Sequence, residues 1–471
     1  MQPPEPPPQL HADTERLGTD PLGKLLFRLS LPAIISMVTI SLYNLVDMFW
    51  VAKLGHEAVA ALTVLMPFYV LIFAVGVGTG VGINALTARR FGERDAEAAH
   101  KAAGQILPLS LLTGGIFLIV AIAFTGPILT LAGATGDILE PGTAYLRTLA
   151  LGIPFLIMQL IGRNVFHAAG DAVRPMIFTI FGQVINAILD PFFIFGWGFF
   201  PEMGISGAAL ATVIANGLSV ALAVYFLFTN RTPYRFRLHH FTPSLPVIRT
   251  IYRVGLPSMA MEATESIIFV LFNHVVAGFG SVALAAMGIG GRISDLAFMI
   301  IIGTSHGLLP IVGYSFGAKQ WQRLWGAVKL ASIWMALLMA VMTVLLEVFA
   351  VQTVQVFNRD PGLVAIAAPG LRIFISTLVV IGPTIMFITT FQGLGKGKDA
   401  MVLSLARQLF FLPVLYGLSA LMGLTGVWLS LPVSDILGVT ASGLWLWREY
   451  RCQKKSGEWE QEPGAAATPP A

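Results

Sequence analysis

Residues 31–52 read LPAIISMVTISLYNLVDMFWVA, a run in which the one charged side chain is Asp47. A helix rises about 1.5 Å per residue, so about 20 apolar residues cross a hydrocarbon core about 30 Å thick. Similar apolar runs recur along the chain of 471 residues. Membrane-spanning strands would instead alternate apolar and polar residues over about 10 positions. The sequence therefore predicts an all-α integral membrane protein.

The composition agrees with this class. Hydrophobic residues make up 56% of the chain, charged residues make up 11%, and the mean hydropathy is +0.77. Soluble domains carry about 25% charged residues, and a chain this poor in charge could not solvate a surface that faces water. We expect membrane lipids to surround the protein. The net charge of +4 is explained by topology, so no nucleic-acid partner is expected.

We predict twelve spanning helices in two lobes of six. Their approximate limits are 31–53, 59–83, 104–132, 143–168, 176–199 and 205–229, then 251–279, 284–312, 326–352, 363–393, 400–422 and 425–447. The predicted N-lobe is 23–230, the predicted C-lobe is 251–450, and a loop at 231–250 joins them. This is a pseudo-symmetric architecture, because the spans of both halves start from the same side.

The two ends of the chain are predicted to be disordered tails, at 1–22 and 451–471. The first is rich in proline and has no apolar segment of a signal peptide. The second contains Cys452, the single cysteine of the chain, so a disulfide within one chain is excluded. Lys and Arg are concentrated in both tails and in the even-numbered loops. By the positive-inside rule, both tails are expected in the cytoplasm and the protein in the inner or plasma membrane.

The two halves are related by a shift of 225 positions without gaps. The patterns LFRLSLP and IYRVGLP, which end at Pro32 and Pro257, fall on each other. Further residues coincide in the same frame: Gly55 with Gly280, Gly78 with Gly303, Phe91 with Phe316, and Gly170 with Gly395. A parallel repeat predicts a pseudo-two-fold axis along the membrane normal, with a substrate path between the halves.

Ionisable residues inside a span point to function, because they are costly in a bilayer. Asn44 and Asp47 lie three apart in the first span, and Asn186 and Asp190 lie four apart in the fifth, so each pair shares one helical face. Thr212 in the sixth span and Asn164 in the fourth are further polar candidates.

Two carboxylates in one apolar pocket favour binding of a shared proton. When ionised, and with amide and hydroxyl oxygens nearby, they also suit a small cation such as Na⁺. The sequence leaves both uses open. The alternative is that Asp47 and Asp190 each lie at a membrane edge and reach water.

Pro32 lies in the first span. It is predicted to be a hinge that couples the state of Asp47 to bending, or else an ordinary proline near a helix start. The glycines of the second span, Gly76, Gly78, Gly80 and Gly82, are typical of close helix packing.

The second half does not repeat this polar pattern. The positions in frame with Asp47 and Asp190 are Phe272 and Leu415. Glu262 and Glu265 lie three apart and form either a second cation or substrate site or part of a structural ion pair, with Arg292 as a partner. The other polar residues of this half are Asp295, His306, Gln392 and Asp435.

The motifs LYNLVDMFWVAKLG, INAILDPFFIFG and AAGDAVRP resemble those of the multidrug and toxic compound extrusion (MATE) family, over about residues 22–450. The resemblance is strongest to the DinF-like and archaeal branch. It implies the two-lobe MATE fold and a secondary active antiporter. Such a protein exports organic cations or amphipathic compounds by alternating access, in exchange for protons or Na⁺, and we expect it to act as a monomer without a cofactor.

The resemblance also implies residue roles. A cation-coupling and substrate site would consist of Asp47, Asn186, Asp190 and Thr212, the residues that would hold Na⁺, with Asn164 less closely matched. Pro32 matches the family's first-span proline, and Glu265 matches a cation-binding glutamate of the NorM branch. The tenth-span Asp of that branch is absent, because Gln392 occupies this region.

Two other functions remain as alternatives. The first is a flippase or exporter of a lipid-linked or polyisoprenoid substrate in the same superfamily, but the acidic and neutral candidates favour cationic cargo. The second is a membrane-embedded enzyme. The sequence has no paired-His metal motif, no G-x-S-x-G and no P-loop, so we expect a transporter and not an enzyme.

Overall fold

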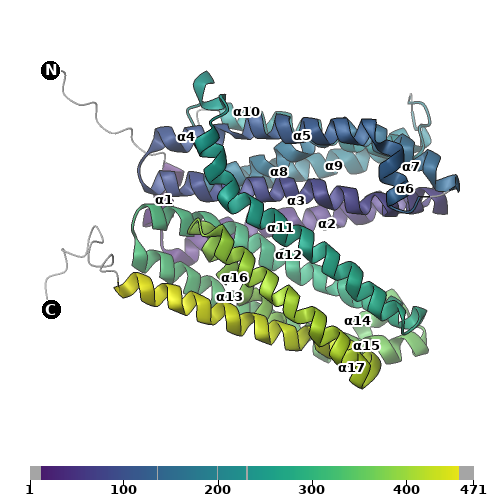
Figure 1. Cartoon of the computed structure of the whole chain (residues 1–471). Helices are drawn as coiled ribbons and strands as arrows, with labels where there is room; N and C mark the ends of the chain where they lie inside the picture. Colours follow the sequence, from purple (N-terminus) through teal and green to yellow (C-terminus); the bar gives the residue numbers. More distant parts are fainter. Residues whose placement is uncertain (1–11, 135, 199, 230–231, 456–471) are drawn as a thin grey trace, which may run out of the picture.

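The computed structural model describes residues 12–134, 136–198, 200–229 and 232–455, and every regular element within these ranges is helical. The helices form two bundles that lie side by side (Figure 1). The short helix α1 (Ala12–Thr19) precedes the first bundle. The last helix of the second bundle ends on the same side of the molecule as α1, and we call this side the α1 end (Figure 1).

The first bundle, the N-lobe, contains the first six predicted spans. Its helices are α2 (Leu22–Ala52), α3 (His56–Gly92), α4 (Ala96–Gly104), α5 (Ile106–Ala123), α6 (Thr125–Leu131), α7 (Leu139–Ala150), α8 (Ile153–Ala168), α9 (Val173–Phe195) and α10 (Ile205–Phe228), with the 3-10 turn η1 (Gly136–Ile138) before α7. The third span is divided into α4, α5 and α6. The fourth is divided into α7 and α8, which are bent by 53° at their junction.

The second bundle, the C-lobe, contains the last six. Its helices are α11 (Leu245–Ala277), α12 (Ser281–Gly317), α13 (Trp321–Val348), α14 (Ala350–Phe357), α15 (Pro361–Ile375), α16 (Leu378–Gly393) and α17 (Gly397–Lys455). The 3-10 turn η2 (Leu238–Phe241) lies in the linker before α11. α15 and α16 together form one span that is bent by 42°.

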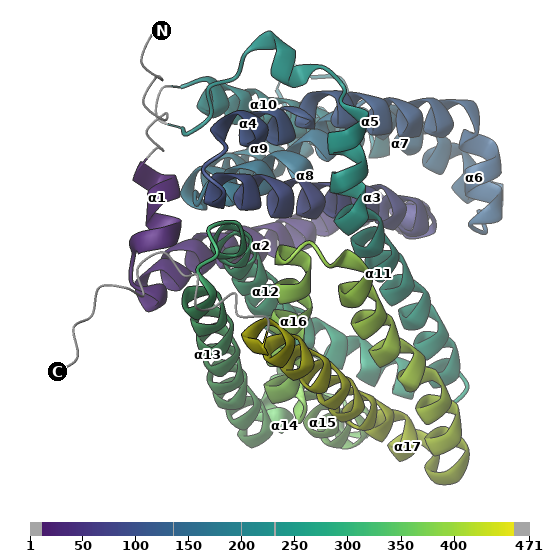
Figure 2. The ribbon, with the colours of Figure 1, turned by 60° about the vertical axis from the view of Figure 1, so that its left-hand side comes forward.

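The number of spans agrees with the predicted twelve. Nine described helices are long and apolar enough to cross a bilayer, and the two bent pairs raise the number to 11. One of these helices, α17, has 59 residues, and its backbone leaves the helical region at Gly423, where φ is 60°. A straight helix of that length would measure about 88 Å, far more than a bilayer. Figure 2 shows its two arms meeting in a sharp turn, so α17 supplies two spans.

The repeat of 225 positions is confirmed by the helix boundaries. α3 and α12 each have 37 residues and begin and end 225 positions apart, and so do α8 and α16. Backbone positions with positive φ recur in the same frame: Gly55 with Gly280, Arg94 with Lys319, Gly170 with Gly395, and Gly198 with Gly423. The chain therefore builds the same six-span unit twice.

The lobes pack most closely in the half of the molecule nearer the α1 end. A Cβ atom on Gly78 of α3 would lie 2.8 Å from the carbonyl oxygen of Gly255 in α11. A Cβ on the frame-related Gly303 of α12 would lie 2.7 Å from the Cα of Ile34 in α2. In the other half of α12, Gly288 has no atom of another helix within 4 Å. The two lobes therefore meet near the α1 end and diverge away from it, as Figure 1 shows. We call the close contact between them the seam.

The glycines of α3 serve two interfaces. Gly78 and Gly82 face α11 across the seam, whereas Gly76 and Gly80 lie against Leu160 and Asn164 of α8 in the same lobe. Small residues let helix backbones approach closely in a bilayer. This agrees with the expectation that these glycines serve packing.

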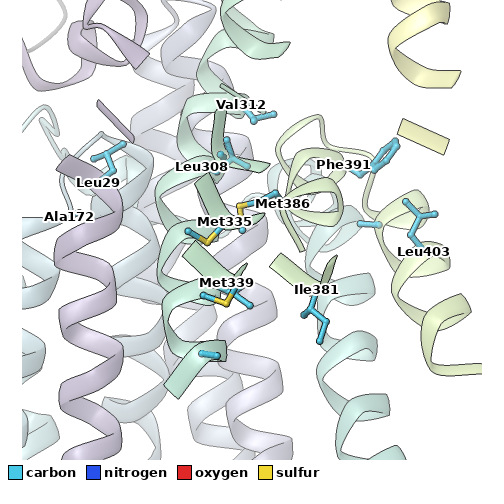
Figure 3. Packing of buried hydrophobic residues seen from close by; sticks show 14 of the residues in the cluster. Leu29, Ala172, Leu308, Val312, Met335, Met339, Ile381, Met386, Phe391 and Leu403 are labelled. Carbon is cyan, nitrogen blue, oxygen red and sulfur yellow. The ribbon is translucent and has the colours of Figure 1, made fainter. Parts of the chain in front are cut away.

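Apolar side chains fill the interior of each lobe. In the C-lobe, Met335 and Met339 of α13 lie against α16 beside Met386 (Figure 3), and a Cβ on Gly382 would lie 3.0 Å from the Cβ of Met335. Flexible methionine side chains fill irregular space between helices. This packing holds α13 on α16.

Some boundaries differ from the expected ones. Of the predicted tails, 1–22 and 451–471, residues 1–11 and 456–471 lie outside the described residues. Residues 451–455 continue helix α17, so the prediction of disorder was wrong there. The part of the first tail that is described forms α1, where Arg323 of α13 donates hydrogen bonds to the carbonyl oxygens of Leu17 and Asp20. α11 begins at Leu245, inside the predicted linker, and Pro32 lies ten residues inside α2 instead of near its start.

Candidate functional site

The most unusual polar residue of the N-lobe is Asp190 on α9. Its side chain is completely buried, and neither carboxylate oxygen has a hydrogen-bond partner. A buried ionised carboxylate without partners costs several kcal/mol or more, so such a group normally takes up a proton or a cation. Full burial also means that the Asp190 side chain does not reach water in this conformation. This residue therefore forms the centre of a candidate ion site.

Asn186 lies one turn before Asp190 on the same face of α9. Its side-chain Nδ2 donates to the hydroxyl of Tyr43 on α2, at 2.6 Å, and to the hydroxyl of Thr212 on α10, at 3.2 Å. These bonds leave its carbonyl oxygen buried and without a partner. Three helices thus meet at Asn186, which presents an oxygen and not a donor to the centre of the site.

Asp47 joins the group from α2. The hydroxyl of Tyr43, one turn away on the same helix, interacts with the Asp47 carboxylate, and the charge of Asp47 acts on Asp190. Asp47 is half-buried, in contrast to Asp190. We call Tyr43, Asp47, Asn186, Asp190 and Thr212 the N-lobe carboxylate site. It gathers two carboxylates, one free amide oxygen and two hydroxyls.

Two more tyrosines surround this site. The side chain of Tyr145 on α7 interacts electrostatically with Asp47 and Asp190, and that of Tyr69 on α3 interacts with Asp47. Together with Tyr43, they are contacts that sequence reasoning missed. Tyr43 could have been predicted from the sequence, because it lies four residues before Asp47 and so on the same helical face.

The structure does not bring Asn44 and Asn164 into the site. Asn44 is exposed and makes no hydrogen bond with a described residue. Asn164 donates to the carbonyl oxygen of Leu160 in its own helix and accepts, at 3.4 Å, from Asn84 of α3. Asn164 can turn toward α3 because Gly80 has no side chain at the point of contact. The two asparagines therefore lie apart from the carboxylates.

The polar residues of the C-lobe are arranged differently. Arg407 of α17 pairs with Asp435 at 3.1 Å, and Asp435 also accepts a hydrogen bond of 3.0 Å from Thr377. A second carboxylate, Glu265 on α11, lies 3.8 Å from Arg407. Sequence reasoning expected Arg292 in this role and overlooked Arg407, although an arginine inside a span is itself a signal.

The remaining polar residues of the C-lobe are separate from that cluster or at its edge. Glu262 interacts electrostatically with Glu265, and Arg292 with Asp295. Gln392 donates to the hydroxyl of Ser258 at 3.2 Å. Glu262 and Glu265 are therefore neighbours, as expected, but Glu265 lies beside an arginine.

One group of described residues has the composition of a metal site. Glu97 of α4 accepts hydrogen bonds of 2.8 Å from Nε2 of His239 and of His240 in the linker. The backbone N–H of Arg237 donates to Nδ1 of His240 at 2.9 Å. Nε2 of His240 must then carry the proton and cannot bind a metal. The group fastens the linker to the N-lobe.

The motif AAGDAVRP forms the turn between α8 and α9. Asp171 accepts from the backbone N–H groups of Val173 and Arg174, and its carboxylate also pairs with the guanidinium of Arg174. Burial raises the pKa of the Asp171 carboxyl, and the charge of Arg174 acts in the opposite direction. This pairing supplies acceptors for the free N–H groups at the start of α9 and so fixes the helix that carries Asn186 and Asp190.

Comparison with known proteins places the chain in a family. The MatE family model matches residues 32–192 and again residues 257–417. The two matches are themselves 225 positions apart, one in each lobe. Together they cover more than half of the chain.

Curated relatives and solved structures agree with this match. The multidrug export protein MepA of Staphylococcus haemolyticus is 28% identical, over 88% of this chain and 90% of that protein. A structure described as the outward-facing conformation of a multidrug resistance MATE family transporter of the MOP superfamily is 29% identical, with a TM-score of 0.89 over 95% of this chain and all of that one.

A third match is a MOP superfamily transporter from Pyrococcus furiosus, at 29% identity and a TM-score of 0.88, covering 95% of this chain and 99% of that one. That transporter is described as having a binding pocket of reverse polarity, which suggests a different function for it. The fold, the duplicated match and the two lobes lead to one conclusion. The chain belongs to the MatE family and is a membrane transporter of that family, not an enzyme.

Proposed function

We propose that this transporter exports small organic cations or amphipathic compounds in exchange for protons or Na⁺ that flow inward through the N-lobe carboxylate site. Similarity to MepA and to the multidrug resistance transporter supports the export of several drugs. Alternating access of the two lobes would carry the cargo across the membrane. No cofactor is needed, because the ion gradient supplies the energy.

The single observation that carries the proposal is the unpartnered, buried carboxylate of Asp190. Asp190 gains most from binding a proton or a cation, and Asp47 nearby is half-exposed and can pass the ion to the space between the lobes. The free oxygen of Asn186 adds a neutral ligand. Hard oxygen ligands of this kind suit Na⁺ as well as a shared proton.

The energetics allow the exchange. One charge that moves through 100 mV yields about 2.3 kcal/mol, and a tenfold gradient costs about 1.4 kcal/mol. One ion could therefore sustain roughly a 40-fold gradient of a neutral cargo on these figures.

We propose further that the α1 end faces the cytoplasm and that the protein lies in the inner or plasma membrane as a monomer surrounded by lipid. The excess of Lys and Arg in the loops at that end supports this orientation. With the seam closed at the cytoplasmic side, the observed arrangement would be open outward. Pro32 would act as the hinge of α2. Glu262 and Glu265 would form a second cation site that depends on release of Glu265 from Arg407.

Transport in proteoliposomes tests the proposal. The purified protein is reconstituted, and export of a fluorescent organic cation is followed with a proton gradient or a Na⁺ gradient imposed alone. We expect one of the two gradients to drive transport in the wild type, and Asp47→Asn to abolish it while expression and the amount of folded protein stay normal. Transport by Asp47→Asn at the wild-type rate would disprove the role of the site.

A further inference from the structure

A second polar cluster, two of whose three members are buried, crosses the seam apart from the N-lobe carboxylate site. Arg163 and His167 lie one turn apart on α8 of the N-lobe, and His306 lies on α12 of the C-lobe. The rings of His167 and His306 stack across the seam, with their centroids 5.6 Å apart and an angle of 28° between planes. Together with Ala33, Ser36 and Met37 of α2, these three side chains line one cavity.

The arginine in this cluster has an incomplete set of partners. Arg163 is 8% exposed, and its Nη1 has no hydrogen-bond partner. His167 is 5% exposed, and its Nδ1 also has none. Buried charges in proteins are paired or hydrogen-bonded, because an isolated charge is strongly unfavourable away from water. The cluster thus offers an unused guanidinium donor and an unused imidazole nitrogen on α8, and the ring of His306 from the other lobe stacks beside them.

The electrostatic surroundings of the cluster are positive. The positive charge of Arg163 acts on the imidazoles of both His167 and His306, and His306 also acts electrostatically on His167. The other group that acts on Arg163 is the phenol of Tyr69 on α3. Within the described part of the chain, no carboxylate pairs with any of the three residues. A guanidinium and two imidazoles that face one cavity without an acid form a natural site for an anion.

The size of the cavity limits the ligand. Its volume is about 10 Å³, counted as the space open to the centre of a water-sized sphere. About 10–15 Å³ on this measure holds one water molecule. The space admits one particle of about the size of water, so a chloride ion requires the lining side chains to move slightly outward, and a large organic anion does not fit.

We propose that Arg163, His167 and His306 bind one small monovalent anion of about the size of chloride, and that this anion bridges the two lobes at the seam. The guanidinium and the imidazole N–H groups donate to it. Because its ligands come from α8 and from α12, the ion can be held fully when the seam is closed and not when the lobes separate there. The anion therefore stabilises the conformation that is closed at the α1 end.

Thermal unfolding of the full-length protein in lipid nanodiscs tests this site without any measurement of transport. Unfolding is followed by tryptophan fluorescence at constant ionic strength, with chloride, bromide, formate or gluconate as the sole anion. We expect chloride and bromide to raise the midpoint saturably by about 2–5 °C over gluconate. Arg163→Gln should remove this dependence, whereas Arg147→Gln, which removes an exposed arginine of the same lobe, should keep it.

The outcomes separate the sources of the anion. A saturable, Arg163-dependent effect of halides supports a free inorganic ion, and a stronger Arg163-dependent effect of formate supports the carboxylate of a cargo molecule. Equal midpoints in all four anions, or the same halide effect in Arg163→Gln, would overturn the proposal. If Arg163→Gln does not fold, crystals of the wild type soaked in bromide decide the question. An anomalous peak among the three side chains supports the site, and its absence at saturating bromide refutes it.

Discussion

The N-lobe and the C-lobe are built from the same six-span unit, but a buried aspartate lacks partners in the N-lobe and is paired with an arginine in the C-lobe. In the N-lobe, Asp190 is fully buried and has no partner for either oxygen. In the C-lobe, the buried Asp435 is held by Arg407 and Thr377. The position in frame with Asp190 is Leu415, which is fully buried in an apolar environment. Duplication supplied the scaffold twice, but among the described residues the buried carboxylate without a partner occurs in one copy.

This difference indicates what each lobe contributes. A buried carboxylate without partners destabilises the fold. We expect such a group only where binding of an ion removes this unfavourable free energy. A satisfied ion pair in the interior fixes the positions of its helices but offers nothing to a passing ion. We infer that the coupling ion binds in the N-lobe and that the C-lobe is a rigid unit relative to which the N-lobe moves.

The largest effect is expected when the C-lobe receives the aspartate that the N-lobe has at the equivalent position. Leu415→Asp places a carboxylate in an apolar core that has no ion pathway. We expect a loss of several kcal/mol in stability, seen as a large fall in the thermal midpoint and in the yield of folded protein. Asp190→Leu, the reverse exchange, should raise the midpoint, since it removes an unpartnered charge. A stable Leu415→Asp variant would show that the two environments are alike.

The ion pair of the C-lobe gives the next largest effect. Arg407→Leu leaves Asp435 buried without its cation and should cost about 3–5 kcal/mol. The double variant Arg407→Leu with Asp435→Leu should recover most of this loss, because no charge is then left unpaired. Chemical or thermal unfolding in lipid nanodiscs measures both. If the double variant were as unstable as the single one, the pair would not be the structural element that we describe.

The shared scaffold can be tested at the seam, with a smaller expected effect. Gly78→Ala and Gly303→Ala place a methyl group against backbone atoms of the opposite lobe, at a cost of about 1–3 kcal/mol for the closed seam. Both should shift the lobes apart at the α1 end by similar amounts, as spin-label distances would report. Gly115→Ala, where nothing lies within 4 Å, is the control. A shift in one of the two seam variants alone would contradict the symmetry.

The smallest predicted effect concerns the hydroxyl of Tyr43. Tyr43→Phe removes the acceptor of a hydrogen bond from Asn186 and a hydroxyl that interacts with Asp47. A typical hydrogen bond contributes about 0.5–1.5 kcal/mol, so we expect a decrease of about 2- to 10-fold in apparent ion affinity in transport assays. Unchanged ion dependence would show that Tyr43 only fills space.

The fold was predictable because its signals are local and repeated. Apolar runs of spanning length and the frame of 225 positions can be read from the sequence, and the helix boundaries confirm them. The turn inside α17 was also foreseen, since two runs of spanning length need a break near Gly423. α1 was missed, because a charged segment of eight residues carries no strong signal and is held by a contact with α13.

Only part of the candidate site could be predicted from the sequence. Spacing placed Asp190 and Asn186 on one face, and the family resemblance grouped them with Asp47 and Thr212. Contacts between distant segments were not readable: neither the stacking of His167 on His306 nor the pairing of Arg407 with Asp435 follows from local spacing. Each depends on how helices from different parts of the chain rotate against one another, which no pattern in a single helix specifies.

The most direct test of a coupling carboxylate confined to one lobe is a comparison of Asp190→Asn with Asp435→Asn in proteoliposomes under the driving gradient. Both variants replace one buried aspartate by its amide. We predict that Asp190→Asn loses gradient-driven transport completely while its thermal midpoint rises or stays the same. Asp435→Asn should transport at a rate close to wild type per folded molecule, with a lower midpoint. Loss of coupled transport in Asp435→Asn, or its survival in Asp190→Asn, would contradict the account.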